Sequence, residues 1–483
     1  MGTRWLNTIV DNGVQWFGGG STQRMPLTAD GGKARPLGSE QKTQTVFEKQ
    51  NIKNAGRTLI IVQNLPVPFD RRVWLEACTL NKSGCQVSVI CPKSEQYSKS
   101  FEQIQDIAVY RYHMPVEARG IFGYLFEFVY AWLATALLSL RVLKNEGFDV
   151  IQACNPPDTF FLLAAIYKLF GKKFIFDHHD LSPEMFAAKF TARHPMLFKG
   201  LCILERLTLK TADVVISTNE SYKKVAVSRG RRKPEDVYVL RTGPDLSKLQ
   251  LHAPNPFFRH GKRYLVTYLG EMCSQDGVDY MLHAVDYIVH HLKRNDIQFV
   301  LMGGGPAMPE YREMSQKMGL SDWVRFTGRV SDPVLSQYLS TSDICIAPDP
   351  MNSWTNSSTM NKVLEYMSFA KPVISFDLKE TRVSAGESAL YIPANDTDAM
   401  GRAVIDLLAD PISRTRMGYH GYLRVHQKLS WTHTHHNLLR AYMRFFPVSL
   451  TEPSQDSPES IPMPRTLSLS FLTAGMTKVA GGE

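Results

Sequence analysis

The chain has 483 residues, enough for two α/β domains of roughly 200 residues each. Hydrophobic residues make up 44% and charged residues 21%, a globular balance that excludes a disordered or fibrous protein. The net charge of +9 favours anionic partners, but the basic residues form no known nucleic-acid-binding motif, so nucleic acid is not an expected partner. Seven irregularly spaced cysteines without a C-x-x-C pair predict free thiols in a reducing compartment, and no zinc site.

Both ends of the chain are expected to be tails. Residues 1–56 are rich in Gly, Gln, Lys and Thr, and residues 447–483 are rich in Ser and Pro, so we expect a flexible and a disordered segment. Met1–Phe17 lack the pattern of a secretory signal, which predicts a cytoplasmic location. The apolar stretch Phe128–Leu140 is expected to be too short to span a bilayer and to form a buried or interfacial helix.

Between the tails, strand-like apolar runs alternate with amphipathic helical segments such as Arg71–Lys82 and Asp279–Leu292. This alternation predicts parallel sheets with helices on both faces. Residues 246–262 lack periodicity and are the expected linker. We therefore predict two doubly wound, Rossmann-like domains, residues 57–245 and 263–446, facing each other across a cleft. The predicted strands are Thr58–Gln63, Gln86–Cys91, Asp149–Ala153, Lys173–Asp177, Asp213–Ser217, Asp236–Leu240, Tyr264–Leu269, Ile297–Met302, Trp323–Thr327, Asp343–Ala347, Pro372–Ser375 and Ala389–Ile392.

Two loops of the first domain carry candidate site residues, because ligands of such folds bind beyond the carboxyl ends of strands. Arg71 and Arg72 follow the first strand and could bind phosphate; alternatively they begin a solvated helix capped by Asp70. The segment Phe176–Glu184 ends a strand with titratable groups suited to proton transfer or hydroxyl binding. Its His178 is expected to point into the core, and its His and Asp residues form an incomplete metal-ligand set.

Three loops of the second domain are candidates as well. Gly303–Pro306 could approach a phosphate closely or be a tight turn, and Phe326–Val330 could read a nucleobase edge or be a plain turn. In Ser357–Met367, Lys362 opposes the helix dipole at a local cost unless an anion offsets it. Glu365 could accept both hydroxyls of a ribose, or pair with Lys362 for about 0.2–0.5 kcal/mol.

The order of these segments resembles the family-4 group of retaining glycosyltransferases, which have the GT-B fold. The likeness covers about Arg57–Phe446. A bacterial polysaccharide-biosynthesis subgroup is indicated by the strings "PFDRRVWLEA", "FDHHDLSPEMF", "VLRTGPDL", "SQDGVDYML" and "STMNKVLEYMSFAKPVISFDL". The resemblance implies transfer of a sugar, with retention, from a nucleotide-sugar such as a UDP-sugar, and separately we expect no metal requirement. It implies a hydroxyl acceptor on a saccharide or a lipid-linked saccharide.

The resemblance also implies roles for individual residues. Glu365 would bind the ribose, and His179 would contact the transferred sugar or the acceptor. Ser430 and Trp431 would begin a helix that crosses back onto the first domain. The remaining donor-side positions are Gly304, Gly305, Gly328, Arg329, Val330, Ser358 and Asn361, and the remaining acceptor-side positions are Asp70, Asp180 and Glu184.

The chain departs from the family pattern at three positions. Ser357 replaces the first glutamate of the Glu-x7-Glu motif, and the diphosphate-clamping Arg and Lys are replaced by Glu271 and Asp276. We expect Lys362, the helix N-terminus near Ser358, and Arg72 from across the cleft to act as substitutes. Two alternatives stay open: a nucleotide-sugar epimerase on the same fold, and a non-catalytic nucleotide-sugar-binding protein. The basic charge and the apolar stretch favour a peripheral contact with the inner face of the cell membrane, with a plain core helix and scattered surface charge as the alternative.

Overall fold

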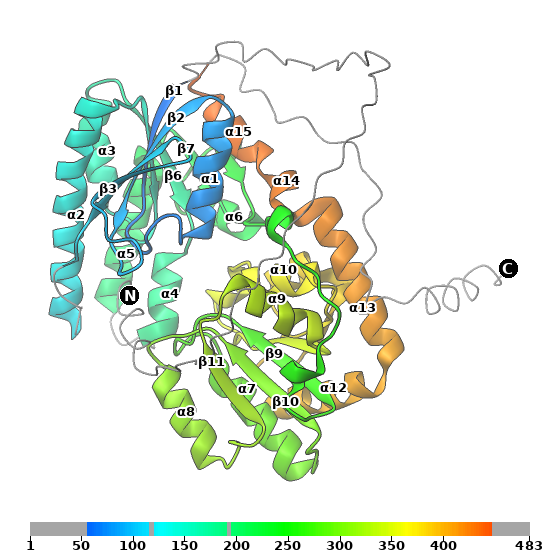
Figure 1. The fold of residues 1–483 in the computed structure, drawn as a ribbon. Helices are drawn as coiled ribbons and strands as arrows, with labels where there is room; N and C mark the ends of the chain where they lie inside the picture. The colour runs from blue at the N-terminus through cyan, green and yellow to red at the C-terminus, as the bar shows by residue number, and fades with distance from the viewer. Residues whose placement is uncertain (1–55, 115–119, 191–194, 447–483) are drawn as a thin grey trace, which may run out of the picture.

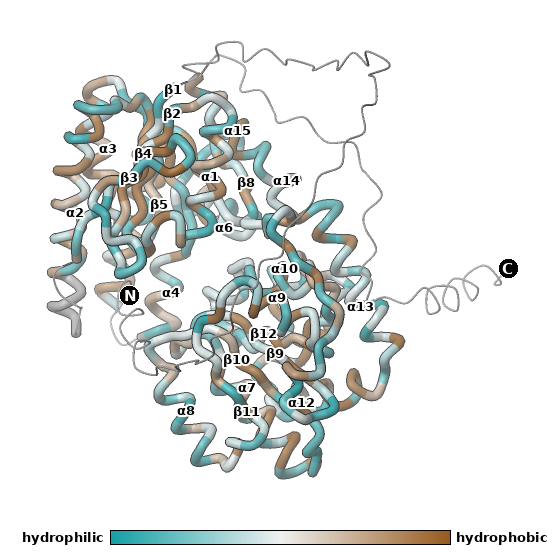
Figure 2. Tube along the Cα trace, in the orientation of Figure 1, coloured by the Kyte–Doolittle hydropathy of each residue, from teal (hydrophilic) through white to brown (hydrophobic). Residues whose placement is uncertain are grey.

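The structure is a computed structural model that describes residues 56–114, 120–190 and 195–446. The predicted tails, except Gly56, lie outside the described residues. Two α/β units, each with its own sheet, are built from the rest of the chain (Figure 1). Figure 2 shows that the most apolar segments run through the inside of both units, where the strands lie.

The first domain contains an eight-stranded sheet in the order β3-β4-β2-β1-β5-β6-β7-β8. All neighbouring strands pair in parallel except β3, which is antiparallel to β4. Six of these strands confirm predicted ones. The strands are β1 (Gly56–Ile61), β2 (Cys85–Pro92), β3 (Phe101–Ile104), β4 (Ile107–Tyr112), β5 (Val150–Cys154), β6 (Lys173–His178), β7 (Val214–Ser217) and β8 (Val237–Val239).

The hairpin of β3 and β4 was not predicted. Gln105 and Asp106 connect these strands, with φ angles of 49° and 64°. These are left-handed conformations of the kind found in two-residue hairpin turns, which glycine or asparagine usually signals. Because neither residue is present, Asp106 is the turn-favouring residue here, and it is a weak signal without a glycine beside it.

The second domain contains a six-stranded parallel sheet in the order β11-β10-β9-β12-β13-β14, which confirms all six predicted strands. These strands are β9 (Tyr264–Leu269), β10 (Ile297–Met302), β11 (Val324–Gly328), β12 (Ile344–Ala347), β13 (Val373–Phe376) and β14 (Ala389–Ile392). The helices are α1 (Arg71–Lys82), α2 (Gly120–Asn145), α3 (Phe161–Lys168), α4 (Ser182–Phe190), α5 (Pro195–Thr211), α6 (Glu220–Ser228), α7 (Val278–Asp286), α8 (Met308–Lys317), α9 (Asp332–Thr341), α10 (Asn361–Ser368), α11 (Lys379–Ala385), α12 (Thr397–Ala409), α13 (Pro411–Arg424), α14 (Trp431–Thr434) and α15 (His436–Tyr442).

The last helices cross back onto the first domain, as the resemblance implied. Leu438 and Leu439 of α15 are fully buried in the core cluster that contains β1 and α1. Trp431 donates from Nε1 to Oγ1 of Thr79 at 3.0 Å. The C-terminal segment therefore completes the core of the first domain (Figure 1).

The chain passes between the domains twice, first around residues 243–262 and again around residues 429–431. The two passages lie close together at Gly243. Residues 246–262 contain two short 3-10 turns, Leu246–Lys248 and Pro256–Arg259. A Cβ on Gly243 would lie 1.9 Å from the Leu429 carbonyl oxygen, so only glycine allows this approach of the two stretches. The domain limits at residues 57–245 and 263–446 stay predictions.

Helix α2 corrects two parts of the expectation drawn from Phe128–Leu140, the short length and the buried position, and leaves the interfacial alternative open. Its segment Phe126–Asn145 is, by length and composition, long and apolar enough to cross a membrane. Only 22% of that segment's apolar window is buried. The predicted segment was too short because it included only the uninterrupted apolar run, whereas the helix continues past Glu127 at one end and past Arg141 and Lys144 at the other.

All seven cysteines are free, as predicted, and five of them are buried.

Candidate active site

The first turn of α1 places neighbouring arginines in different surroundings. Asp70 caps the helix, accepting a hydrogen bond at Oδ1 from the backbone N–H of Val73 at 3.1 Å. Arg71 is exposed and extends to the second domain, whereas Arg72 is buried in the first. Asp70 therefore caps the helix, which was the alternative given for this segment to phosphate binding. The two arginines have different partners.

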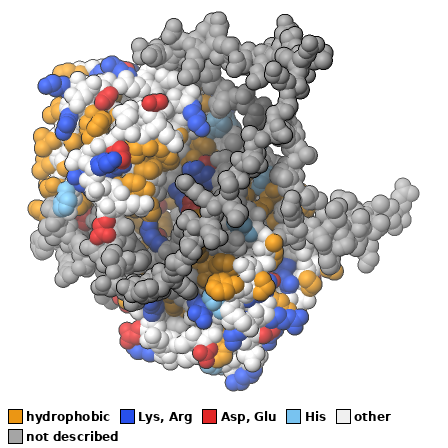
Figure 3. All heavy atoms as spheres, viewed as in Figure 1, with side chains coloured by type: hydrophobic (Ala, Val, Ile, Leu, Met, Phe, Trp, Pro, Cys, Tyr) orange, Lys and Arg blue, Asp and Glu red, His pale blue; other side chains and the backbone are white. Residues whose placement is uncertain are grey.

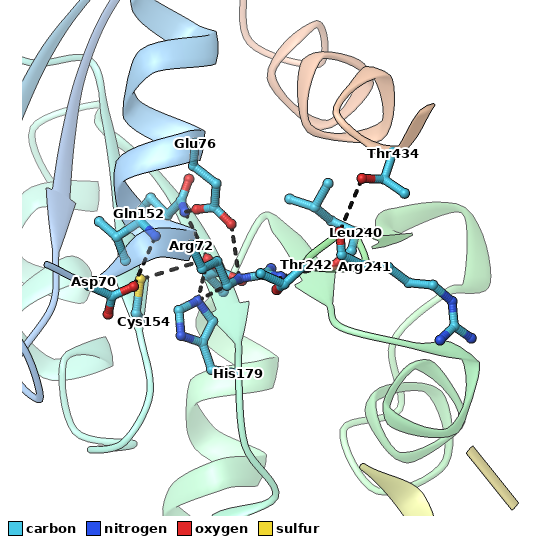
Figure 4. A network of polar contacts seen from close by, with 12 residues as sticks. Asp70, Arg72, Glu76, Gln152, Cys154, His179, Leu240, Arg241, Thr242 and Thr434 are labelled. Atoms are coloured by element: carbon cyan, nitrogen blue, oxygen red, sulfur yellow. Dashed lines mark hydrogen bonds and ion pairs between the residues drawn. The ribbon is translucent and has the colours of Figure 1, made fainter. Parts of the chain in front are cut away.

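Arg72 is bound within the first domain and does not reach across the interface (Figure 4). It donates from Nη2 to Asp177 Oδ1 at 2.8 Å and from Nη1 to Leu240 O at 2.9 Å and Thr242 Oγ1 at 2.8 Å. Its Nε lies 3.0 Å from Oε1 of the fully buried Glu76. The expectation that Arg72 clamps a diphosphate across a cleft is therefore corrected: its guanidinium pairs with the buried carboxylate of Asp177.

The pKa values of the two buried carboxylates, Asp177 and Glu76, are shifted in opposite directions. Burial raises the pKa of Asp177, but the charges of Arg72 and His179 outweigh it, and the pKa lies well below its usual range. Burial and the neighbouring Asp177 raise the pKa of Glu76 well above its usual range. The lowered pKa favours an ionised Asp177 beside the Arg72 cation, and the raised pKa favours the protonated form of Glu76.

His179 lies at the edge of this network. Its Nε2 lies 2.7 Å from Asp177 Oδ2 and 2.9 Å from Arg72 Nε, so the tautomer decides which contact is a hydrogen bond. Its backbone N–H donates to Oδ1 of Asn155 at 2.7 Å, and the amide of Asp180 donates to the same oxygen at 3.2 Å. Asn155 thereby fixes the loop that carries His179 and Asp180.

One group in the described residues has the donor set of a metal site. The ligand atoms of Cys154, Asp177 and His179 lie within 4.8 Å of one another. Asp177 already faces the Arg72 guanidinium, and burial raises the pKa of Cys154 well above its usual range, which keeps the thiol protonated. A permanent cation beside a neutral thiol fits a divalent ion poorly. Metal independence itself stays a prediction.

Other residues of the same loop have structural surroundings. His178 is fully buried, as predicted, and it stacks on Phe176, with ring centroids 5.1 Å apart. Glu184 pairs with Arg229, which also contacts the buried Glu205. The acceptor-side role of Glu184 is therefore not supported by its surroundings, because its carboxylate is already neutralised.

In the second domain, the glycine loop packs against the loop that follows β9. A Cβ on Gly303 would lie 1.9 Å from Gly270 O, and one on Gly305 would lie 2.2 Å from Met272 O. Gly304 accepts at its carbonyl from the backbone N–H of Met272 at 3.0 Å. Close loop packing thus accounts for Gly303 and Gly305, and their contact with a donor stays a prediction.

Lys362 is paired with a buried carboxylate that sequence reasoning missed. Its Nζ donates to Oδ1 of Asp349 at 2.7 Å, and their side chains are only 10% and 2% exposed. Asp349 is therefore the anion that offsets Lys362 at the start of α10. Nearby, burial and Asp349 raise the pKa of Asp276 to about 7, against the opposing effect of Lys362.

The serine loop before α10 forms part of the domain interface. Ser358 Oγ lies 2.8 Å from Tyr222 OH, and Asn219 donates from Nδ2 to Ser357 O at 2.9 Å. Ser358 is buried, whereas Asn361, the first residue of α10, is exposed. The loop thus sits against the first domain, and the Ser358 hydroxyl is engaged there.

Arg71 bridges the domains at Glu365. It donates from Nη1 to Glu365 Oε1 at 3.3 Å and from Nη2 to Asp332 Oδ1 at 2.8 Å. Burial raises the pKa of Glu365, with Arg71 opposing the rise. Arg329, expected near the base, places its guanidinium carbon 4.7 Å from the ring centre of Phe69 in the first domain. Its neighbour Gly328 is the last residue of β11. Its other neighbour, Val330, packs against the core of the second domain.

Three residues that position the loops of the candidate site were not singled out from sequence: Asn155, Asn219 and Asp349. Each lies just beyond a strand end, at β5, β7 and β12. Inspecting every such position would have included them, but nothing in their local pattern distinguishes them from turn residues.

Two family models match consecutive parts of the chain. Residues 71–248 match a model described as Glycosyltransferase Family 4, and residues 263–410 match one described as Glycosyl transferases group 1. The chain is 28% identical over 157 residues to the alpha-D-kanosaminyltransferase of Streptomyces kanamyceticus, covering 32% of this chain and 39% of that protein. It is 24% identical over 334 residues to O-antigen chain mannosyltransferase C of Escherichia coli, covering 67% of this chain and 82% of that protein.

Solved structures show the same fold. Sucrose-phosphate synthase from Thermosynechococcus elongatus has a TM-score of 0.63 at 18% identity, covering 82% of this chain and all of that one. Anabaena HepE, in complex with UDP and glucose, has a TM-score of 0.61 at 13% identity, covering 81% of this chain and all of that one. The chain therefore has the two-domain GT-B fold, with one part similar to a glycosyltransferase family 4 model and the next part similar to a group 1 model, and it spans about two fifths of the length of the kanosaminyltransferase.

Proposed function

We propose that this enzyme moves a sugar, with retention, from a UDP-sugar to a hydroxyl of a saccharide or lipid-linked saccharide during cell-surface polysaccharide biosynthesis. The observation that carries the proposal is the placement of Glu365 at the domain interface, where Arg71 already binds its carboxylate. The likeness to an O-antigen chain mannosyltransferase supports the saccharide acceptor.

Donor binding must change the Arg71–Glu365 contact. A ribose whose hydroxyls donate to Glu365 replaces Arg71 at that carboxylate, and Arg71 is then free to face an anion. Because Glu271 and Asp276 stand where the family has cations, the departing diphosphate needs positive charge from elsewhere. Arg71 is the supplier that the contacts favour, since Arg72 and Lys362 each neutralise a buried carboxylate.

A peripheral contact with the inner face of the cell membrane belongs to this proposal, because a lipid-linked acceptor lies in that surface. In the transfer step the protein orients both substrates, excludes water and stabilises charge, with His179 beside the transferred sugar or the acceptor. No metal is expected to take part.

The proposal is tested by incubating the purified chain with UDP-sugars and a lipid-linked oligosaccharide extract. Transfer of label to the lipid fraction supports it. Sugar epimerised in the donor alone, without an acceptor, would support the epimerase alternative. Donor binding without turnover on any acceptor would support the non-catalytic alternative.

A further inference from the structure

Exposed large apolar side chains are concentrated on three neighbouring helices of the first domain. Of the 23 large hydrophobic residues exposed in the described parts of the chain, 14 lie on α2, α3, α5 and the turn after α3. Figure 3 shows hydrophobic side chains along the left edge of the molecule, where Figure 1 places α2. We call this surface the α2–α3–α5 face; its exposed apolar residues are Phe126, Phe128, Val129, Leu133, Leu137, Leu140, Leu162, Ile166, Leu169, Phe170, Met196, Leu197, Ile203 and Leu207.

Helix α2 is apolar on its outer side as well as on the side that packs against the core. Its fully buried positions include the small or hydroxyl-bearing Ala131, Thr135 and Ser139. The large Leu133 and Leu137 point outward and are 53% and 69% exposed. A surface helix of a water-soluble protein normally buries its large apolar residues and exposes polar ones. The outer surface of α2 therefore has the composition of a surface in contact with an apolar phase.

The three helices form one continuous layer. Ser139 Oγ lies 2.9 Å from Tyr167 OH, which joins α2 to α3. Lys168 donates from Nζ to Thr211 O at 2.8 Å, which joins α3 to the end of α5. All three helices contribute to the same buried cluster on one side of the first sheet. Their outward residues thus form one surface rather than three separate patches.

The charges on this layer are nearly all positive. The described parts of the three helices contain two carboxylates: Glu127 is partly exposed, and Glu205 is buried and paired with Arg229. The exposed cations are Arg141, Lys144, Lys199, Arg206 and Lys210. Apolar residues among cations match a surface of anionic headgroups over acyl chains.

We propose that the α2–α3–α5 face is the docking surface of this enzyme for an anionic lipid bilayer, with the helices lying in the plane of the interface. This inference rests on the proposed function, because it names the surface that would bring a lipid-linked acceptor to the first domain. α2 lies on the membrane rather than across it, since spanning would strip Ala131, Thr135 and Ser139 from the first-domain core. A second copy is a poorer occupant, because a two-fold interface would place these cations opposite one another.

The test is flotation of the full chain with vesicles of phosphatidylglycerol and phosphatidylcholine, and with vesicles of phosphatidylcholine alone. The test variant is Leu133→Ser/Leu137→Ser/Leu140→Ser. The matched control is Val383→Ser/Phe257→Ser/Ile412→Ser, which removes exposed apolar residues of the second domain and linker. A second variant, Lys199→Glu/Arg206→Glu/Lys210→Glu, tests the charge.

We expect the unmodified chain and the control to float with the anionic vesicles. Each face variant should lower the ratio of bound to free protein by about tenfold or more. No flotation of the unmodified chain would overturn the proposal, and so would equal flotation of all variants. Self-association lost in the leucine variant, without vesicle binding, would instead assign the face to a second copy.

The change in melting temperature on adding a UDP-sugar, measured on every variant, tests donor binding independently of vesicle binding. A retained shift shows that the variant is folded and binds the donor. Loss of flotation with a retained shift therefore concerns the face alone. No shift in the unmodified chain would count against the proposed function, whatever the flotation result.

Discussion

Arg71 of the first domain donates a hydrogen bond to Glu365 of the second, with Nη1 and Oε1 3.3 Å apart. Because the Arg71 side chain is 60% exposed, this ion pair is expected to add at most about 1 kcal/mol to stability. Its importance is in position rather than strength, since it places a cation from one domain beside the proposed ribose-binding carboxylate of the other.

The first prediction concerns Arg71→Ala. We expect the melting temperature to change little and kcat/KM for transfer to fall by about tenfold to a hundredfold, because the diphosphate loses a cation. Arg71→Lys should restore part of the activity, since it keeps the charge but loses the planar fork. Steady-state kinetics with saturating acceptor measures this, and unchanged kinetics in Arg71→Ala would refute the assignment.

Arg72→Leu should behave in the opposite way. The substitution leaves Asp177 buried without its partner, so we expect a loss of stability of about 3–5 kcal/mol. Chemical denaturation compared with Arg71→Ala measures the contrast between two adjacent residues. Equal stability of the two variants would contradict the buried network shown in Figure 4.

The contrast between Arg71 and Arg72 shows what sequence could and could not provide. Periodicity located the strands because buried parallel strands are apolar runs, and the motifs lay where strands end, as expected. Neighbouring arginines in a first helical turn point about 100° apart, so their partners depend on how the domains are arranged. The pairing of Lys362 with Asp349 likewise joins residues from different loops, and no local pattern encodes it.

Asp276 should make both stability and donor binding depend on pH. Its folded-state pKa of about 7 lies above the unfolded value, so the folded state holds the proton longer and this group's contribution to stability falls as pH rises from about 4 to 7. Asp276→Asn removes this term, so its melting temperature relative to the unmodified chain should be higher at pH 8 than at pH 5.

Donor affinity should follow the same titration. An ionised Asp276 repels a diphosphate, so nucleotide-sugar affinity should weaken as pH rises through about 7, and less so in Asp276→Asn. Calorimetry with a nucleotide-sugar measures this, because its diester phosphates do not titrate in the range. The same pH dependence in the unmodified chain and Asp276→Asn would show that another group is responsible.

Leu438→Ala should report the role of the crossing helix. Leu438 is fully buried in the first-domain core although it lies near the C-terminal end of the described chain. We expect a loss of about 2–5 kcal/mol of stability from the missing contacts and the cavity. Denaturation monitored in both domains should show the first domain destabilised, and an effect confined to the second domain would contradict the packing.

The central claim is that Glu365 lies in a nucleotide-sugar site, and a thermal-shift screen of UDP-, GDP- and other nucleotide-sugars tests it most directly. The chain is compared with Glu365→Ala and with Glu313→Ala, which changes an exposed glutamate of α8 that pairs with its helix neighbour Lys317. A ligand at 100 times its Kd should add about 2.7 kcal/mol of stability. We expect the melting temperature to rise with one class of nucleotide, the uridine nucleotides. Glu365→Ala should lose this shift, and Glu313→Ala should keep it. An equal shift in all three proteins, or no shift with any nucleotide, would contradict the account.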